Sequence, residues 1–357
     1  MATAATGIEA YVGGAKVFAV SGRQQPAGGA EAAAARPMAP GWTPARNGFC
    51  LLTGQRMPPA EEAFEETPGS FGVSTLFRFA GARAEAVAAN TAPAAAPPPL
   101  APYYQHIAEA AKAAFPEAEY VWVQGHIIFS AEVSPLKNIR VLLYNAATRA
   151  LAGLLSKVFP CCVPAKAARN SGAKATVPVF GAAEFVHVDE SAEQGAEQLS
   201  QAIGNSIRLP DGFVSDASKQ RRVVSANFWR NLRADKAIKN HHLAVVDAQT
   251  VTEDELHAAK FKNYAIGGQE QYHLAVKESH RLVYFPDMAQ SEILVFKQGE
   301  YEVRRVAEGQ HSVTAAAEPQ RSFIFHTAIV DPAAPKDAPP RKSIVCAGVK
   351  IIMPEAD

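Results

Sequence analysis

The chain has 357 residues, enough for one large domain or two small ones, either of which can bury a sizeable core. Its 35 Lys and Arg residues balance 35 Asp and Glu residues, so no net field favours nucleic acid or an anionic membrane as a partner. The four cysteines contain no CxxC pair, which argues against a structural zinc site and a disulfide framework.

Two stretches rich in Ala, Pro and Gly interrupt the amino-terminal part of the sequence. Residues 24–47 and 88–102 carry few large apolar side chains, which is typical of exposed connections. We therefore expect an amino-terminal arm at residues 1–100, packed on the core, and a main domain at residues 101–357. Neither a long apolar segment nor a signal-peptide pattern is visible, so we expect a soluble, cytoplasmic protein without a membrane partner.

Several helices are predicted in the main domain. Apolar residues recur at helical spacing in Tyr103–Phe115 and in Thr148–Phe159. Two capping-box patterns, Ser191–Gln194 and Thr252–Glu255, predict that further helices begin there. The second of these helices is expected at Leu256–Tyr264.

Strand patterns dominate from Val223 onward. The predicted strands, rich in β-branched and aromatic residues, are Val223–Trp229, Leu243–Asp247, Arg281–Phe285, Ile293–Phe296, Ser322–Val330 and Ser343–Ile352, preceded by Ala15–Val20, Phe49–Thr53 and Tyr120–Phe129. Short strands with mostly turn-like connections predict a mainly β fold with flanking helices. We expect an antiparallel barrel or a double-layered jelly roll.

Two segments of this predicted fold carry candidate metal ligands. His187 and Asp189 flank one valine, so on an extended segment both side chains point to the same side. His326 lies far downstream, in the apolar run Phe323–Val330, and a rolled sheet can bring such remote positions together. Two imidazoles and one carboxylate can bind one face of a ferrous ion and leave the opposite face open.

Each of these residues also has a simpler interpretation. His187 and Asp189 can be a surface histidine and a helix-capping aspartate, since a three-residue pattern recurs by chance. A histidine at position 326 can be a core residue that a backbone carbonyl satisfies. The order of the motifs along the whole chain is more specific than any one of them.

A guanidinium follows the second histidine at the start of the last predicted strand. Arg341 comes after the Pro339–Pro340 turn, and Ser343 lies two residues on, on the same face. A guanidinium can hold the far carboxylate of a keto acid through paired charge-assisted hydrogen bonds. The alternative is a solvated strand end.

The predicted strand Val223–Trp229 continues into two further candidates. Alternation along it places Asn227 on one face and Arg230 on the other. An inward Asn227 can hydrogen-bond a carboxylate near the metal and belongs with the cofactor-binding residues. Arg230 is a candidate for neutralising an acidic substrate, or for an ion pair outside the site.

Eight stretches of the sequence match those of a known enzyme family. They are Tyr103–Tyr104, Val186–Ser191, Asn227–Arg230, Leu243–Asp247, Val283–Met288, Glu292–Lys297, His326–Pro332 and Ala338–Ile344. With these stretches, the carboxy-terminal two thirds resemble the hydroxylase/desaturase family of iron and 2-oxoglutarate oxygenases of secondary metabolism, which includes 7α-cephem-methoxylase and gibberellin desaturase relatives. One departure is Gln298-Gly-Glu300, which stands where an Asp-Ser step is common in the family.

The resemblance implies both a fold and a set of site residues. It implies a double-stranded β-helix, a cupin-like jelly roll, with iron ligands at His187, Asp189 and His326. It also implies that 2-oxoglutarate binds at Arg341 with Ser343. The cofactors expected are therefore Fe(II), 2-oxoglutarate as cosubstrate, and O2.

The motifs and the resemblance together predict a non-heme iron(II)/2-oxoglutarate-dependent oxygenase. Its expected substrate is a small-molecule natural product or an amino-acid-derived intermediate, and not a nucleic acid. Hydroxylation, desaturation or ring formation would accompany release of succinate and CO2. Two alternatives are a catalytically silent cupin-like small-molecule-binding protein and a metal-dependent isomerase or lyase that uses no oxygen.

Overall fold

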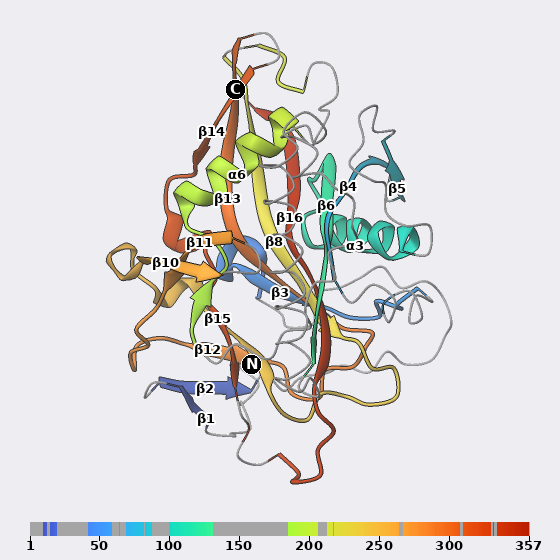
Figure 1. Cartoon of the computed structure of the whole chain (residues 1–357), viewed down its shortest axis with the longest axis vertical. Coiled ribbons are helices and arrows are strands. Elements are labelled where there is room, and N and C mark those ends of the chain that lie inside the picture. Colours follow the sequence, from blue (N-terminus) through green and yellow to red (C-terminus); the bar gives the residue numbers. More distant parts are fainter. Residues whose placement is uncertain are drawn as a thin grey trace, which may run out of the picture.

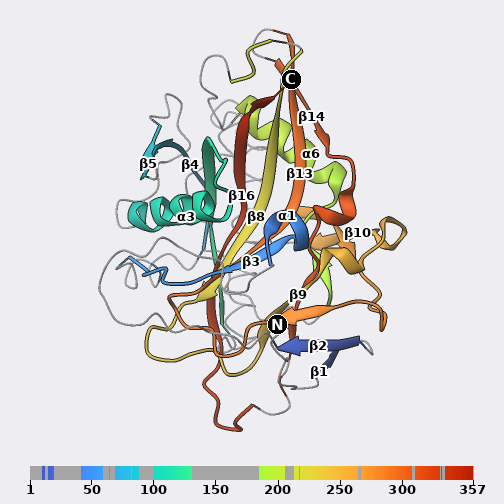
Figure 2. The same ribbon diagram turned by 180° about the vertical axis from the view of Figure 1, so that it is seen from behind.

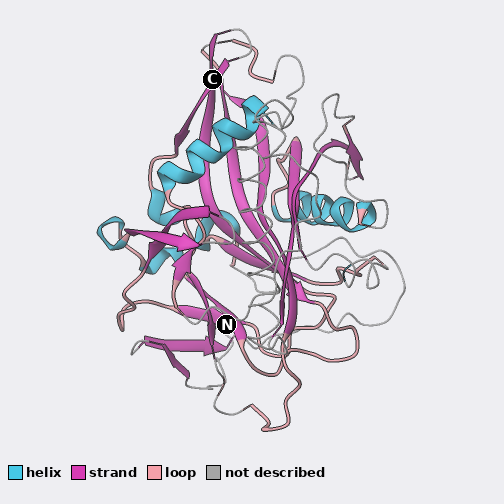
Figure 3. Cartoon of the chain, viewed as in Figure 1, coloured by secondary structure: helices cyan, strands magenta, loops and turns pink. Residues whose placement is uncertain are grey.

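Two β-sheets form the framework of the protein in its computed structural model (Figures 1 and 3). The structure describes residues 10–12, 15–19, 42–58, 64, 69–81, 83–87, 100–130, 185–205, 213–216, 218–263, 267–307, 310–329, 331 and 334–356. The helix predicted at Thr148–Phe159 and most of the two Ala/Pro/Gly-rich stretches lie outside these residues.

Each sheet has eight strands within the described residues. The first sheet has the order β1 (Ala10–Val12), β2 (Ala15–Ala19), β12 (Leu282–Tyr284), β9 (His242–Val246), β15 (His326–Ile329), β7 (His187–Val188), β11 (Gly267–His273) and β10 (His257–Asn263). The second has the order β14 (Gln310–Ala315), β13 (Ile293–Ala307), β8 (Gln220–Asn231), β16 (Lys342–Ala356), β6 (Tyr120–Ser130), β4 (Gly69–Ala80) and β5 (Arg83–Ala86), with β3 (Phe49–Leu52) also paired to β13. Neighbouring strands are antiparallel except for β2 and β12, which are parallel.

The two sheets share an apolar core. Leu243 and Val245 of β9 belong to the same buried cluster as Trp229 of β8, Phe296 of β13 and Val345 of β16. Because strand side chains alternate, these odd positions of β8 and β16 define the inner face of the second sheet. The prediction of a mainly β fold with flanking helices, arranged as two layers, is confirmed.

Helix α3 (Ala101–Ala114) covers the outer face of the second sheet, opposite the first sheet (Figures 1 and 2). A proline in its first turn suits the free N–H positions of a helix start. Its buried face includes Tyr104, Ile107 and Ala111, which pack with Ala226 and Phe228 of β8. The helix predicted at this place from apolar spacing is confirmed.

Helix α6 (Ala192–Asn205) follows β7 directly and packs against β13 and β14 (Figure 1). The Ser191 hydroxyl accepts a hydrogen bond from the Gln194 backbone N–H at 3.3 Å, as expected for a helix N-cap. The short helix α1 (Pro44–Asn47) lies beside β3. Single 3-10 turns occur at Ala248–Thr250, Glu253–Glu255 and Pro319–Arg321.

The helix predicted at Leu256–Tyr264 is wrong. The Thr252 capping box is present, but it starts only the 3-10 turn Glu253–Glu255. The following residues form β10, which pairs along its whole length with β11. Long-range pairing with β11 therefore overrides the helical composition of this segment.

The other predicted strands are confirmed with shifted ends. The strand predicted at Ile293–Phe296 continues to Ala307, whereas the one predicted at Ser322–Val330 begins only at His326. The prediction missed β1, β4, β5, β10, β11 and β14. No helix in the described part of the chain is long and apolar enough to cross a membrane.

The division into an arm at residues 1–100 and a domain at residues 101–357 stays a prediction, although β3 and β4 both belong to the second sheet.

Candidate metal centre

Backbone pairing brings the two histidines of the expected triad together. Strand β7 pairs with β15 so that His187 and His326 lie directly opposite each other. Val188 is fully buried in an apolar cluster with Phe325. The ligand atoms of His187, Asp189 and His326 all lie within 4.8 Å of one another. The expected convergence of two remote segments is therefore present.

The Asp189 carboxylate lies between the two imidazoles. Its Oδ1 is 3.6 Å from His187 Nε2 and 3.8 Å from His326 Nε2. His187 Nδ1 donates to the Phe185 carbonyl at 2.9 Å, and His326 Nδ1 lies 3.4 Å from the Ile324 carbonyl. Because a carbonyl can only accept, each Nδ1 carries a proton, and each Nε2 is the ring nitrogen that faces the carboxylate.

The environment shifts the pKa of all three groups. Burial, and then the neighbouring His187, lower the pKa of His326 to about 4. Burial also lowers the pKa of His187, but the hydrogen bond and charge of Asp189 outweigh it, so the net shift is upward. For Asp189, burial raises the pKa, but the two imidazoles and the Asn227 amide outweigh it and hold the pKa well below its usual range. The carboxylate is thus ionised and His326 neutral at neutral pH, the states that a metal requires.

Asn227 fixes the second oxygen of this carboxylate. Its Nδ2 donates to Asp189 Oδ2 at 2.7 Å, and its Oδ1 accepts from the Gly348 backbone N–H at 2.9 Å. Asn227 is buried, and β16 is irregular opposite it, between Cys346 and Val349. This is the hydrogen bond to a carboxylate that strand alternation predicted, and it orients Asp189.

Arg341 and Ser343 lie on the inner side of the second sheet. Arg341 Nη1 donates to the His241 carbonyl at 2.7 Å, and its guanidinium lies 5.7 Å from the centre of the Trp229 ring. Burial lowers the pKa of Arg341 to about 10, so it remains a cation at neutral pH. Within the described residues no carboxylate lies at ion-pair distance from it, and the buried Ser343 hydroxyl has no hydrogen-bond partner. A buried cation and a buried hydroxyl are thus both available to an acidic ligand.

Arg230 lies elsewhere. It is fully buried on the opposite face of β8 from Asn227. Its Nε donates to the Gln290 carbonyl at 2.9 Å, its Nη2 donates to the Gln55 carbonyl, and its Nη1 lies 3.0 Å from His106 Nε2. The expected contact with an acidic substrate beside the triad does not fit this position, because these partners occupy the guanidinium on the outer side of the sheet. The alternative of an outside ion pair does not fit either.

Phe185 and His273 extend the site on one side of His187. The Phe185 ring centre lies 4.5 Å from that of His187 and 5.3 Å from that of His273. Phe185 is 41% exposed, whereas the other phenylalanines whose burial the structure describes are buried or half-buried, and the Asp189 side chain is 39% exposed. The two histidine ligands are exposed by only 9% and 10%. The triad is therefore open on the side of Asp189, with an aromatic ring at its edge.

Several buried groups around the triad carry no sequence motif. Lys350 Nζ donates to Ser225 Oγ at 2.8 Å and lies 3.4 Å from Glu190 Oε1, which also accepts from the Tyr301 hydroxyl at 2.9 Å. Gln298 contacts the Asp189 backbone. Of these residues, only Gln298 stands out in the sequence, because it departs from the family pattern.

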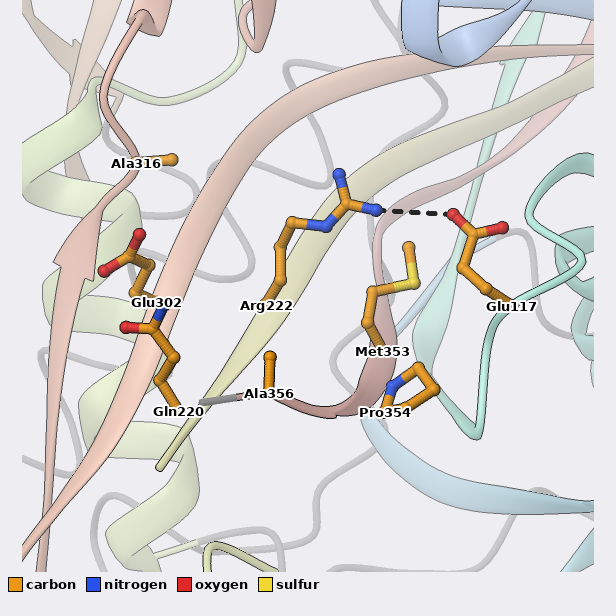
Figure 4. A pocket seen from close by; sticks show the side chains of 8 residues that line it. All are labelled: Glu117, Gln220, Arg222, Glu302, Ala316, Met353, Pro354 and Ala356. Carbon is orange, nitrogen blue, oxygen red and sulfur yellow. Dashed lines mark hydrogen bonds and ion pairs between the residues drawn. The ribbon is translucent and has the colours of Figure 1, made fainter. Parts of the chain in front are cut away.

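A separate pocket contains none of the expected site residues. This cavity has a volume of about 360 Å³. Figure 4 shows its lining, in which Arg222 extends toward Glu117. Arg222 is 3.3 Å from Glu117 and 3.6 Å from Glu300, so its charge is already paired. This pocket therefore offers no binding chemistry comparable to that of the triad.

Comparison with known proteins relates this site to a class of enzymes. The Fe(II)/2-oxoglutarate-dependent dioxygenase nvfI of Aspergillus novofumigatus (strain IBT 16806) is 27% identical over 169 residues, which are 46% of this chain and 51% of that protein. The chain thus spans about half the length of the curated relative that it matches.

Solved structures show the same fold. A variant of the iron and alpha-ketoglutarate-dependent endoperoxidase NvfI superposes with a TM-score of 0.51 at 16% identity, covering 88% of this chain and 78% of that one. NvfI in a different conformation gives a TM-score of 0.52 at 16% identity, covering 87% and 78%. The two antiparallel sheets are those of the double-stranded β-helix, and the chain is a homologue of an Fe(II)/2-oxoglutarate-dependent dioxygenase with a candidate His–Asp–His facial triad.

A protein-family model also matches the chain. The model described as "Oxidoreductase/YMDC permease-like domain" matches residues 166–347, just over half of the sequence. The chain belongs to the family that this model describes.

Proposed function

We propose that this protein is a non-heme iron(II)/2-oxoglutarate-dependent oxygenase that oxidises a small organic molecule. His187, Asp189 and His326 would hold the iron, and Arg341 with Ser343 would hold the cosubstrate. The observation that carries the proposal is the meeting of two imidazole nitrogens and one carboxylate oxygen within 4.8 Å. Two nitrogens and one oxygen are the donor set of the non-heme iron oxygenases.

The surroundings of the three ligands fit a divalent cation. Each histidine turns its Nδ1 toward a carbonyl, and Asn227 hydrogen-bonds Asp189 Oδ2. Metal-binding side chains in proteins are commonly held in this way by hydrogen bonds to their other polar atoms. The iron, when bound, supplies the oxidising chemistry, using O2 and 2-oxoglutarate and releasing succinate and CO2. The protein's own residues supply ligand orientation and a partly closed, apolar surrounding.

Arg341 and Ser343 fit a dicarboxylate cosubstrate. The buried guanidinium stacks near Trp229 and keeps further N–H groups beyond the one that binds His241. A buried cation is costly unless an anion accompanies it, so a carboxylate there would be bound strongly. The free Ser343 hydroxyl on the same strand face can donate a further hydrogen bond to it.

The class of substrate follows from the open side of the triad. Phe185 presents an exposed ring next to His187, so we infer that a substrate packs an apolar surface against it. A small-molecule natural product or an amino-acid-derived intermediate fits this surface. Removal of hydrogen from a carbon of such a molecule would lead to hydroxylation, desaturation or ring formation.

An assay of succinate tests the proposal. Incubated in air with Fe(II) and 2-oxoglutarate, the protein should release succinate slowly even without its substrate, and His187→Ala and His326→Ala should abolish this release. His311→Ala, in β14, is the matched control and should retain it. Succinate release that is unchanged in the two triad variants would refute the assignment. A protein that binds metal but releases no succinate would instead be the silent cupin-like binder.

A further inference from the structure

Gln298 occupies an irregular position in the long strand β13. Its neighbours Lys297 and Gly299 pair with successive residues Ala226 and Ser225 of β8, so Gln298 is an extra residue with no partner in that register. Such a bulge redirects a side chain and is common beside functional sites. Gln298 is only 1% exposed. The bulge therefore sends a buried amide toward the triad.

This one amide reaches both chain segments that carry the triad. Gln298 Oε1 accepts from the Asp189 backbone N–H at 2.9 Å. Gln298 Nε2 donates to the Ile324 carbonyl at 3.2 Å and to its neighbour's carbonyl, that of Lys297, at 2.9 Å. The Ile324 carbonyl is also the group that faces Nδ1 of His326. One end of the amide thus contacts the segment of Asp189, and the other contacts the segment of His326.

We propose that Gln298 is a positioning residue that couples these two segments and sets the triad geometry before a metal binds. The inference rests on the proposed metal centre. A ligand set works only when its members are held close to their bonding geometry, and the partners of the ligands provide this. Only a side chain with both an acceptor and a donor, long enough to span the two segments, can make this link.

The backbone around the bulge strengthens this link. Ile324 N–H donates to the Lys297 carbonyl at 3.1 Å, so β13 already contacts the His326 segment at this level. The Phe296 ring centre lies 4.9 Å from that of His326. The segment of Asp189 has no such backbone contact with β13 among the hydrogen bonds of the described residues. Two side chains of β13 reach it instead: Gln298 at the Asp189 backbone itself, and Tyr301 at the neighbouring Glu190.

The test uses Co(II) as a probe of the metal site, followed by its visible absorption. Gln298→Met keeps the length of the side chain and removes all three hydrogen bonds of the amide, whereas Gln298→Asn keeps the amide but is too short to span both segments. Gln290→Met is the matched control, because the Gln290 amide also donates to a carbonyl, that of Leu232, at 2.9 Å, away from the triad. The melting temperature of each metal-free variant is measured in parallel.

Gln298→Met and Gln298→Asn should each raise the Kd for Co(II) by about 10- to 100-fold and change the absorption bands. Gln290→Met should lower the melting temperature about as much as the Gln298 variants do. It should leave the Kd for Co(II) and the absorption bands unchanged. Wild-type affinity and bands in the Gln298 variants would overturn the inference, as would equal weakening in Gln290→Met. If Gln298→Met does not fold, Gln298→Asn decides by the same criteria. Absence of Co(II) binding by the unmodified protein would instead overturn the proposed metal centre itself.

Discussion

At the scale of single residues, the site combines two imidazoles, one ionised carboxylate and one buried cation. The carboxylate keeps its charge because two histidines and Asn227 stabilise it more than burial destabilises it. The guanidinium of Arg341 keeps its charge although burial lowers its pKa to about 10. These charge states suit a metal on one side and an anionic cosubstrate on the other.

Replacing Arg341 tests the cosubstrate site. Arg341→Ala should raise the KM for 2-oxoglutarate roughly 10- to 150-fold, because a hydrogen bond to a charged group contributes about 1.5–3 kcal/mol. Arg341→Lys should recover part of the loss, since a lysine retains the charge without the planar fork. Succinate release measured against 2-oxoglutarate concentration gives both values. An unchanged KM in Arg341→Ala would place the cosubstrate elsewhere.

Much of the site at this scale could be predicted from the sequence. The spacing of His187 and Asp189 gives two side chains on one side of a strand, and alternation gives the inward Asn227. The role of Gln298 could not be predicted, because it depends on a bulge that shifts the register of β13 by one residue. Strand alternation also places Arg230 on the correct face of β8. Its hydrogen-bond partners in α3 and in the loops could not be predicted, because only the tertiary structure brings them together.

At the scale of elements, two strand irregularities flank β8 near Asn227, one on each side. One is the bulge at Gln298 in β13, and the other lies between Cys346 and Val349 in β16. In the second, Gly348 adopts a φ of 62°, which side chains with a Cβ rarely adopt. This conformation lets the Gly348 backbone N–H reach Asn227.

Gly348→Ala should strain this irregularity. We expect a loss of about 1–2 kcal/mol in the free energy of unfolding, the cost of a left-handed conformation for a residue with a Cβ. Gly81→Ala is the control, because Gly81 has a φ of 67° in the turn between β4 and β5. Denaturant unfolding should show similar losses for both variants, while only Gly348→Ala weakens Co(II) binding. Equal Co(II) affinity in the two variants would contradict the link between the irregularity and the site.

The capping box that starts only a 3-10 turn has a consequence for pH dependence. Burial raises the pKa of Glu255, but hydrogen bonds from Lys277, Thr252 and His280 outweigh it, so the folded-state pKa lies below the ordinary 4.5. A depressed pKa contributes stability above the unfolded-state value, and this contribution is lost as the pH falls below 4.5.

Glu255→Gln should therefore lower the melting temperature at neutral pH, and its difference from the unmodified protein should shrink as the pH is lowered below 4.5. Glu278→Gln, at an exposed residue of a nearby turn, should change little at any pH. Calorimetry over this pH range measures the effect. A constant difference at all pH values would mean that the carboxylate of Glu255 is not stabilised by its partners.

At the scale of the whole molecule, the fold has an inner and an outer apolar layer, and the chemistry lies on the inner side. The inner layer joins the two sheets through Trp229 and Phe296, and the outer layer joins the second sheet to α3 through Phe228. The apolar strands of both layers were predictable from β-branched and aromatic runs. The polar strands β10, β11 and β14 could not be predicted in this way, because their strand conformation depends on pairing with a neighbouring strand.

Arg230 links several elements of the outer layer through hydrogen bonds. Replacing it should change the stability of the protein without changing ligand binding. Arg230→Met should lower the free energy of unfolding by about 1–3 kcal/mol, because buried carbonyl groups lose their donor. The KM for 2-oxoglutarate and the Kd for Co(II) should stay unchanged, since the side chain lies on the far face of β8. Urea unfolding with the succinate assay measures both. A large rise in KM at unchanged stability would restore a role in ligand binding.

The most direct test of the metal centre is diffraction from crystals of the protein loaded anaerobically with Fe(II), with data collected at the iron absorption edge. We expect one strong anomalous peak at bonding distance from His187 Nε2, Asp189 Oδ1 and His326 Nε2, and no peak there in His326→Ala. A peak away from these three atoms, or an iron bound by only one of the two strands β7 and β15, would contradict it.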